Sequence, residues 1–588
     1  VANGNSNHGG GMACWDSSSP TLKNCTFTNN SAAYKGGGIS CLSSSPTLEN
    51  CAFTNNSANN GGGIDCRDNS SPSLVSCTFT NNAATYGGGM YSRDTSSPTL
   101  DNCVFTDNSA TNSGGGMYSR DTSSPSIDNC TFENNRADYK GGGMACLSSA
   151  PTLINCMFTG NTANHGGGIS CRDNSSPTLD SCTFTNNTAF DDGGGMACSA
   201  GSPTLDNCAF TDNLANYGGG IACESNSSPT LDNCTLKSNT ANYGGGMACW
   251  DSSSPTLNSC TLKSNTANHG GGIYYISPSS TVLQLNACTF TNNVATYHGG
   301  GISCGGYSSA SLDSCTFTDN SAVHGGGIAC KDNSSPTLDN CAFTNNTATE
   351  DGGGVACGDS SSASLDSCTF TNNTATEDGG GMACGDSSSA SLVSCTFTSN
   401  TATEDGGGIS CGDSSSPTLD GCMFTDNTAN HGGGAYSKDT SSPTLDNGTF
   451  TNNFAQRHGG GISCVGSSSP TLKNCTLTNN TATYGGGMAC GDSSSASLDS
   501  CTFMDNTANH GGGMACGDFS SPTLKNCTLT NNTAHADGGG ISCGSSSSPT
   551  AENCILWDND APNGAEINGP AAVTYSDVKG GWAGTGNI

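Results

Sequence analysis

The feature that most constrains this chain is a repeating segment, first seen as GGGMACWDSSSPTLKNCTFTNNSA at residues 9–32. Versions of it occur 21 times up to about Ala561, with 25 to 29 residues from one Gly triplet to the next. A fixed period of this length is typical of a solenoid, in which each repeat is stable only against its neighbours. The triplet and a Ser-Pro or Ser-Ala turn interrupt every repeat, so no window has helical periodicity.

Short alternating segments remain between these turns. Met12 and Cys14 alternate with outward residues, as do the residues around Phe27, and a period of two places the apolar ones on one face of a strand. The sequence therefore predicts an all-β parallel β-helix of about 21 turns over residues 1–561. Residues 562–588 are expected to form a closing turn or a connector.

An asparagine lies two residues before the alanine that closes each corner. Its recurrence in every repeat predicts a stacked amide ladder, in which each side chain bonds to the next turn. The first members of this ladder are Asn30, Asn56, Asn82 and Asn108.

The charge balance limits the partners. The chain has 48 acidic and 16 basic residues, a formal net charge of −32, so we expect nucleic acid and anionic membranes to be repelled and cations to be attracted. No apolar run is long enough for a transmembrane helix. The chain opens at Val1 within what reads as the end of an earlier turn, so we expect a leader or further repeats to have preceded it.

The element Gly36-Gly37-Gly38-Ile39, together with Phe27 to Asn30, resembles the repeats of polymorphic outer membrane proteins and related bacterial surface β-helices. The resemblance covers residues 1 to about 561, and the segment from Ile555 to Trp582 is similar to the closing turns of secreted right-handed β-helix proteins. It implies a right-handed helix and a secreted or surface-exposed protein, and it assigns no chemistry.

The 37 cysteines fall at two regular positions of the repeat, ten or eleven residues apart. In an extracellular chain, this spacing favours one disulfide within each turn, which would compensate for a thin apolar core. Two columns of buried free thiols are the alternative, and zinc is disfavoured because four ligands do not converge. The expected disulfide residues are Cys14 with Cys25, Cys41 with Cys51, Cys66 with Cys77, Cys171 with Cys182, and Cys357 with Cys368.

Glycosylation is a second expected feature of an extracellular chain. Asn-x-Ser/Thr sequences occur at outward positions, although such matches arise freely in a chain rich in these residues. The sites considered are Asn24, Asn29, Asn55, Asn69, Asn174 and Asn186.

Two surface columns precede the Gly triplets. Eight of the nine histidines occupy the position just before a triplet, where they alternate with Tyr and Asp. Three consecutive repeats carry a Glu-Asp pair there, and stacked carboxylates of this kind are either solvated or bridged by Ca²⁺. Calcium is the one cofactor considered, with the ligands Glu350, Asp351, Glu377, Asp378, Glu404 and Asp405.

No set of unique acids and bases converges in the sequence, so we predict that the chain is not an enzyme. The favoured function is an extracellular or cell-surface structural or adhesive rod that associates end to end, as the subunit of a filament or matrix. The alternatives are a carbohydrate-binding adhesin or polysaccharide-active β-helix, with glycans or cell-surface molecules as partners, and an ice-binding protein. Ice binding would use outward Thr-x-Thr pairs such as Thr26 with Thr28 and Thr369 with Thr371.

Overall fold

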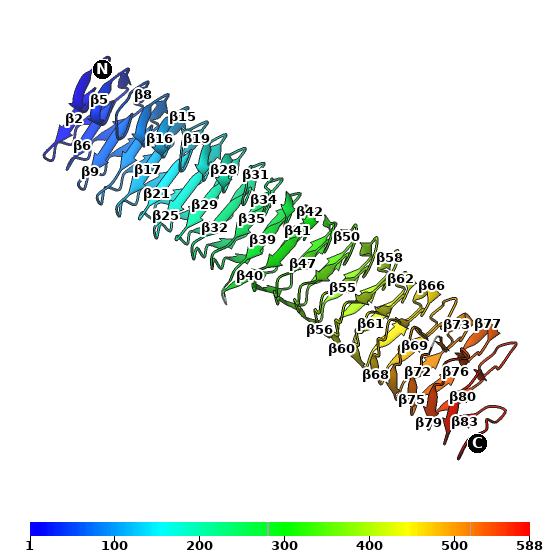
Figure 1. Cartoon of the computed structure of the whole chain (residues 1–588). Helices are drawn as coiled ribbons and strands as arrows, with labels where there is room; N and C mark the ends of the chain where they lie inside the picture. Colours follow the sequence, from blue (N-terminus) through cyan, green and yellow to red (C-terminus); the bar gives the residue numbers. More distant parts are fainter. Residues whose placement is uncertain (279–280, 518) are drawn as a thin grey trace. The chain divides into compact units, whose positions relative to one another are not determined.

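The computed structural model describes residues 1–278, 281–517 and 519–588, and within these residues it contains strands and turns but no helix. The chain divides into two compact units, Val1–Val294 (unit 1) and Ala295–Ile588 (unit 2). In each unit, successive turns stack so that every strand pairs in parallel with its counterpart one turn away (Figure 1). The predicted parallel β-helix is therefore confirmed.

The first repeat shows how each turn is built. After the glycines comes β2 (Met12–Trp15), followed by β3 (Thr21–Lys23) and β4 (Thr26–Thr28), and then β5 (Ser31–Lys35) closes the corner. The apolar residue of each strand points inward and the flanking polar residues point outward, as the period of two requires.

The strands that follow the Gly triplets are here called triplet strands. Their outward residues form the surface described in the next subsection. In unit 1 they are β2 (Met12–Trp15), β6 (Ile39–Leu42), β9 (Ile64–Arg67), β13 (Met90–Ser92), β17 (Met117–Arg120), β21 (Met144–Leu147), β25 (Ile169–Arg172), β29 (Met196–Ser199), β32 (Ile221–Glu224), β35 (Met247–Cys249) and β39 (Ile273–Ile276). In unit 2 they are β43 (Ile302–Gly305), β47 (Ile328–Cys330), β51 (Val355–Cys357), β55 (Met382–Cys384), β59 (Ile409–Cys411), β63 (Ala435–Ser437), β67 (Ile462–Cys464), β70 (Met488–Cys490), β74 (Met514–Cys516) and β78 (Ile541–Cys543).

In the core, identical side chains from successive turns stack on one another. Phe27 pairs in register with Phe53, and their rings lie nearly parallel with centroids 5.0 Å apart. The rings of Phe79 and Phe105 lie 4.5 Å apart in the same column. Because each phenylalanine of the column is covered by a phenylalanine or leucine of the neighbouring turn, a repeat with few apolar residues still buries these rings completely.

The Gly triplet is explained by close approach between turns. Gly352 adopts a φ of 68°, a left-handed conformation that favours glycine. A Cβ atom on the next residue, Gly353, would lie only 2.3 Å from the backbone oxygen of Gly380 in the following turn. The triplet is therefore needed for stacking as well as for turning the chain.

The asparagine ladder runs through both units. The side-chain Nδ2 of Asn30 donates to Oδ1 of Asn56 at 2.9 Å, and Asn56 donates to Asn82 and Asn82 to Asn108 in the same way. Each amide also bonds backbone groups; Asn56 Nδ2, for example, donates to the carbonyl of Phe27 in the preceding turn. These buried polar groups are thus paired, as a β-helix corner requires.

The cysteines form two columns of free thiols in this structure. Cys14 lies in register with Cys41 of the next turn, and in unit 2 the Sγ atoms of Cys464 and Cys490 are 3.1 Å apart. Cys14 and Cys25, which we expect to pair within a turn, are both free thiols here, and disulfide bonding stays a prediction. The two positions belong to different sides of the turn, and the cysteines in register are those of successive turns, such as Cys14 with Cys41.

The strand stack continues beyond Ala561. The strands β81 (Ile567–Asn568), β82 (Ala572–Thr574) and β83 (Asp577–Val578) pair with the last complete repeat of unit 2. The chain therefore has about one turn more than the 21 expected from the repeat, because this last turn lacks most of the consensus residues.

Candidate functional site

The outward positions of the triplet strands in unit 2 form the floor of a groove. On β47, β51, β55 and β59 these positions hold Ala329, Ala356, Ala383 and Ser410, all small residues. The hollow over this floor encloses about 240 Å³. Small floor residues leave room for a ligand because larger side chains stand on both sides of the strands.

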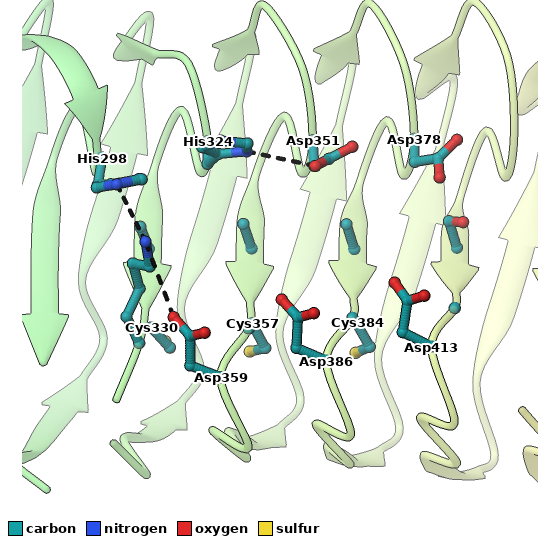
Figure 2. Close-up of a pocket in the computed structure, with 18 of the residues that line it drawn as sticks. His298, His324, Cys330, Asp351, Cys357, Asp359, Asp378, Cys384, Asp386 and Asp413 are labelled. Atoms are coloured by element: carbon teal, nitrogen blue, oxygen red, sulfur yellow. Dashed lines mark hydrogen bonds and ion pairs between the residues drawn. The ribbon is translucent and has the colours of Figure 1, made fainter. Parts of the chain in front are cut away.

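Two walls flank the floor, as Figure 2 shows. One wall is the column just before the Gly triplets, with His298, His324, Asp351 and Asp378. The other wall comes from the turn after each triplet strand and contains Asp359, Asp386 and Asp413. Side chains from successive turns therefore line the groove at intervals of one turn, about 4.8 Å.

The histidines of the first wall are paired with groups from neighbouring turns. Lys331 Nζ lies 3.1 Å from His298 Nε2 and 3.8 Å from the Asp359 carboxylate, so it connects the two walls (Figure 2). Nδ1 of His324 lies 3.3 Å from Asp351, and this hydrogen bond raises the pKa of His324 against the opposing effect of burial.

A lysine neutralises part of the acidic column. Nζ of Lys438 lies 2.8 Å from the carboxylate of Asp378 and 3.6 Å from that of Asp405. Burial, together with the charge of Asp378, raises the pKa of Asp405 to about 7. Lys438 lies 60 residues beyond Asp378 in sequence, so this ion pair has no local sequence signal.

The six carboxylates predicted as calcium ligands do not form one cluster. Asp378 and Asp405 share Lys438, whereas the side chains of Glu377 and Glu404 are exposed. Glu350 and Asp351 lie beside His324, and the ligand atoms of these three residues are within 4.8 Å of one another. His324, Glu350 and Asp351 are the residues of this wall with the geometry to hold a divalent metal ion, and calcium binding stays a prediction.

The outward face of the triplet strands, here called the groove face, continues toward the C-terminus of unit 2. There a different set of side chains forms the wall. Over the floor residues of β67, β70, β74 and β78 there is a larger hollow of about 570 Å³. The rings of His458, Tyr484 and His510 line it and stack with centroids 5.1 Å apart, and His431, outside the lining, continues the stack 5.0 Å from His458. Burial lowers the pKa of His431 to about 4, so its ring is neutral at physiological pH. Burial also lowers the pKa of His458, and the stacked rings of this wall present their edges to the hollow.

The triplet-strand face of unit 1 is also hollowed, and its lining differs in charge. A hollow of about 240 Å³ lies over β17, β21 and β25, which are neighbouring strands in Figure 1. It is lined by Tyr86, Tyr118, Tyr139, Arg120, Lys140 and Arg172, together with smaller residues. No carboxylate belongs to this lining, whereas five aspartates line the first hollow of unit 2.

Asp65 occupies the floor position of β9, and its side chain is completely buried. Its Oδ2 atom accepts a hydrogen bond from Arg67 Nε at 3.1 Å, and its Oδ1 atom has no hydrogen-bond partner. Burial raises the pKa of Asp65 to about 7, although Arg67, Lys35 and Arg93 act in the opposite direction.

Asp65 makes stability depend on pH. Because its folded-state pKa of about 7 exceeds the ordinary value of 3.8, the folded chain binds this proton more tightly, and stability increases as the pH falls from 8 toward 5. We expect Asp65→Asn to remove at least about 1 kcal/mol of the gain in unfolding free energy between pH 8 and pH 5.5, since one pKa unit corresponds to about 1.4 kcal/mol. Urea titrations at the two pH values measure it. The exposed neighbour Asp68, changed to Asn, is the control, and an equal pH dependence in wild type and Asp65→Asn would contradict the prediction.

The other residues singled out from the sequence lie away from the groove or beneath it. The sequon asparagines are all exposed and adopt positive φ angles at turns: Asn24, Asn29, Asn55, Asn69, Asn174 and Asn186. The Thr-x-Thr pairs, such as Thr26 with Thr28, flank the buried phenylalanine column on another side of the turn. The predictions of glycosylation and ice binding stay predictions.

Sequence reasoning missed the basic residues of the groove face. Arg67, Arg93, Arg120 and Arg172 each lie four residues after the last glycine of a triplet, and so do Lys331 and Lys438. That constant offset, which is visible in the sequence, predicts one column for the four arginines of unit 1 and the same position of the turn for the two lysines of unit 2.

The described residues contain no helix with the length and apolar character needed to cross a bilayer. No curated protein matches the chain. Among solved structures, it is similar to the PL6 family alginate lyase AlyGC, with 10% identity, coverage of 97% of both chains and a TM-score of 0.29. It is also similar to a mutant of that lyase, with 11% identity, coverage of 100% of this chain and 96% of that one, and a TM-score of 0.31.

These comparisons correct one sequence-based prediction. We predicted that the chain is not an enzyme, and the similar solved structures are polysaccharide lyases, so that exclusion is withdrawn. The sequence argument failed because it looked for residues that occur once, whereas outward residues of successive repeats meet on one face. At these TM-scores the likeness assigns no activity and no residue role.

The repeat also matches a family description. The matched segments are residues 10–163, 62–236, 139–287, 245–424 and 407–579, which together span nearly all of the chain. The likeness to polymorphic outer membrane protein repeats stays a prediction. The chain belongs to the right handed beta helix region family.

Proposed function

We propose that this chain is an extracellular, adhesive β-helix that binds a linear polysaccharide along the groove face of unit 2. The observation that carries the proposal is the floor of small residues, Ala329 to Ser410, which continues over four successive triplet strands between two polar walls. A linear polymer made of repeated sugars matches a site made of repeated turns, because one contact can recur at each step.

The walls have the chemistry that sugars require. The carboxylates of Asp359, Asp386 and Asp413 are exposed hydrogen-bond acceptors for hydroxyl groups. Farther along the same unit, His458 and Tyr484 stack on each other and line the second hollow with their ring edges, whose polar atoms are further hydrogen-bond partners for sugar hydroxyls. Hydrogen bonds repeated over several turns together give orientation and affinity in a shallow site.

Blocking the floor tests this function. Ala383 lies at the centre of the floor, and Ala383→Phe would fill the groove from an outward position without entering the core. We expect its affinity for the neutral hexasaccharide that binds wild type best to fall by at least about tenfold, equivalent to about 1.4 kcal/mol. Isothermal titration calorimetry with cellohexaose, mannohexaose and laminarihexaose measures the binding.

Thr369→Phe is the matched control, because Thr369 is an exposed outward residue of β53 (Thr369–Thr371), on another side of the turn. It introduces the same side chain and should leave affinity unchanged. The proposal fails if none of the three oligosaccharides binds, or if Ala383→Phe binds as well as wild type. Size-exclusion chromatography of the parent polysaccharide after incubation separates binding alone from binding with chain cleavage.

A further inference from the structure

Basic residues are concentrated on one face of unit 1. The chain has only 16 Lys and Arg residues against 48 acidic ones, yet six of the 16 lie beside the triplet strands between residues 35 and 172. They are Lys35 and Lys140, just before a triplet, and Arg67, Arg93, Arg120 and Arg172, just after a triplet strand or at its end. The strand register places Arg120 next to Leu147 and Leu147 next to Arg172, so these three residues occupy the same position in successive turns and form one column.

Only part of this column is neutralised by neighbouring acids. Arg67 pairs with Asp65, Arg93 with Asp94 at 2.9 Å, and Arg120 with Asp121 at 2.7 Å. Within the part of the chain that the structure describes, neither Lys140 nor Arg172 forms an ion pair. Among the described residues Lys35 forms none either, so three of the six basic residues are unpaired, and two of them, Lys140 and Arg172, line the same hollow.

Lys140 and Arg172 face the same hollow from opposite sides of the floor. Lys140 is half-buried, and its pKa is lowered first by burial and then by the positive charge of Arg172. Two like charges held together in a partly desolvated hollow repel each other, and an anion bound between them would relieve that repulsion. The carboxylates of Asp173 and Glu224 act in the opposite direction on the pKa of Lys140, and an anion in the hollow would add to that compensation.

Tyrosines complete the lining. The rings of Tyr86 and Tyr118 stack with centroids 5.7 Å apart, and Nζ of Lys140 lies 4.4 Å from the centre of the Tyr139 ring. The hollow therefore combines cationic donors with tyrosine side chains, which offer aromatic ring edges and hydroxyl groups to a sugar that carries an acidic group.

We propose that the hollow lined by Lys140, Arg172 and the three tyrosines binds an acidic sugar of a linear polysaccharide. Its carboxylate or sulfate ester lies between Lys140 and Arg172, and its ring lies against the tyrosines. The inference rests on the proposed function, glycan binding by the groove face of unit 2, and adds a separate site in unit 1 with the class of sugar that it selects.

A nucleic acid fits this surface less well. The basic residues of unit 1 provide at most about one positive charge per turn, and successive turns are about 4.8 Å apart. B-DNA carries one negative charge per about 1.7 Å of its axis. The rest of the chain is strongly acidic and repels a polymer of such charge density. A polysaccharide with one acidic group on some or all of its sugars is the better match.

Charge-matched variants of the full chain test this inference. The double variant Lys140→Gln/Arg172→Gln removes two charges from the hollow, and Lys23→Gln/Lys237→Gln removes two from exposed positions on other strands. We expect the first to bind a hexuronate hexasaccharide at least about tenfold more weakly than wild type, since hydrogen bonds to charged groups contribute about 1.5–3 kcal/mol. The second should bind as wild type does.

Four probes separate the sources of binding: the hexuronate, its carboxyl-reduced neutral form, a sulfated form of that neutral oligosaccharide, and single-stranded DNA of similar length. Binding of hexuronate or sulfated oligosaccharide but not of the neutral form, weakened by salt, supports the inference and identifies which acidic group is held. Equal binding of the neutral form, or equal loss in both double variants, overturns it. Tighter binding of DNA, lost in Lys140→Gln/Arg172→Gln, overturns it in favour of a nucleic-acid site.

The two proposals fail separately. Ala383→Phe in unit 2 should leave hexuronate binding to unit 1 intact, and Lys140→Gln/Arg172→Gln should leave binding of the neutral hexasaccharides intact. Loss of both kinds of binding in either variant, with unchanged thermal melting, would contradict the assignment of separate sites.

Discussion

Replacing Gly380 by alanine is expected to lower the free energy of unfolding by about 3 kcal/mol or more, at or beyond the upper end of the range for overpacked sites. The added Cβ would lie 2.5 Å from the backbone oxygens of Gly407 and Thr401, both in the adjacent turn. Side chains can rotate away from such a contact, but these are backbone atoms held by the parallel pairing of the turns. Urea unfolding monitored by circular dichroism measures the loss.

Gly385→Ala is the matched control, since it makes the same chemical change five residues later. Its Cβ would meet only the carboxylate of Asp413, at an ordinary 3.7 Å, and Gly385 does not adopt a positive φ. Its stability should equal that of wild type or exceed it slightly, because alanine restricts the unfolded chain. Similar stability of the two variants would show that the turns can separate at the triplet without cost, contrary to the close stacking described above.

The second large effect is expected for Asn373→Ala. The fully buried Asn373 side chain makes four hydrogen bonds: two accepted from Asn346, one donated to the carbonyl of Phe343 and one donated to Asn400. Its removal leaves several buried groups without partners, each costing about 1–3 kcal/mol, so the total loss should be about 3 kcal/mol or more. Chemical unfolding gives the total, and hydrogen exchange should show increased exchange at the amide of Asn346.

Thr374→Ala tests whether position in the turn explains the effect. Thr374 follows Asn373 directly, but its side chain is exposed, so its removal should cost less than about 0.5 kcal/mol. If Asn373→Ala proved equally mild, then water or a shifted neighbour would be satisfying the broken ladder, and the ladder would not be a main source of stability.

The fold could be predicted from the sequence because its determinants repeat. Phe27 and Asn30 recur at the same spacing in turn after turn, and both need a copy of themselves above and below to be buried and paired. A pattern with this property indicates a stacked solenoid before any coordinates are available. The spacing of the cysteines within a repeat does not distinguish a disulfide within the turn from a thiol stacked on the thiol of the next turn, such as Cys14 on Cys41.

The site could not be derived in the same way. Its residues come from the outward positions, which vary, and their partners lie one or more turns away. Lys438 forms an ion pair with Asp378, which lies 60 residues earlier in the sequence. Lys140 and Arg172, whose positive charges repel each other, are separated by more than one repeat. A sequence pattern that is read one repeat at a time sees isolated charges at these positions. Aligning the repeats on their Gly triplets would have shown the basic column, although not the burial that makes Lys140 and Arg172 repel each other.

The independence of inward and outward positions has a consequence for how such a chain can change. Excising one whole repeat would keep every phenylalanine above a phenylalanine or leucine and every asparagine above an asparagine, much as the loss of a complete codon preserves a reading frame. The residues flanking the cut would nevertheless acquire new neighbours, so that a lysine could come to face a different aspartate. Duplication or loss of a single repeat would thus change which outward side chains are neighbours on the binding surface, while the core of the β-helix stays the same.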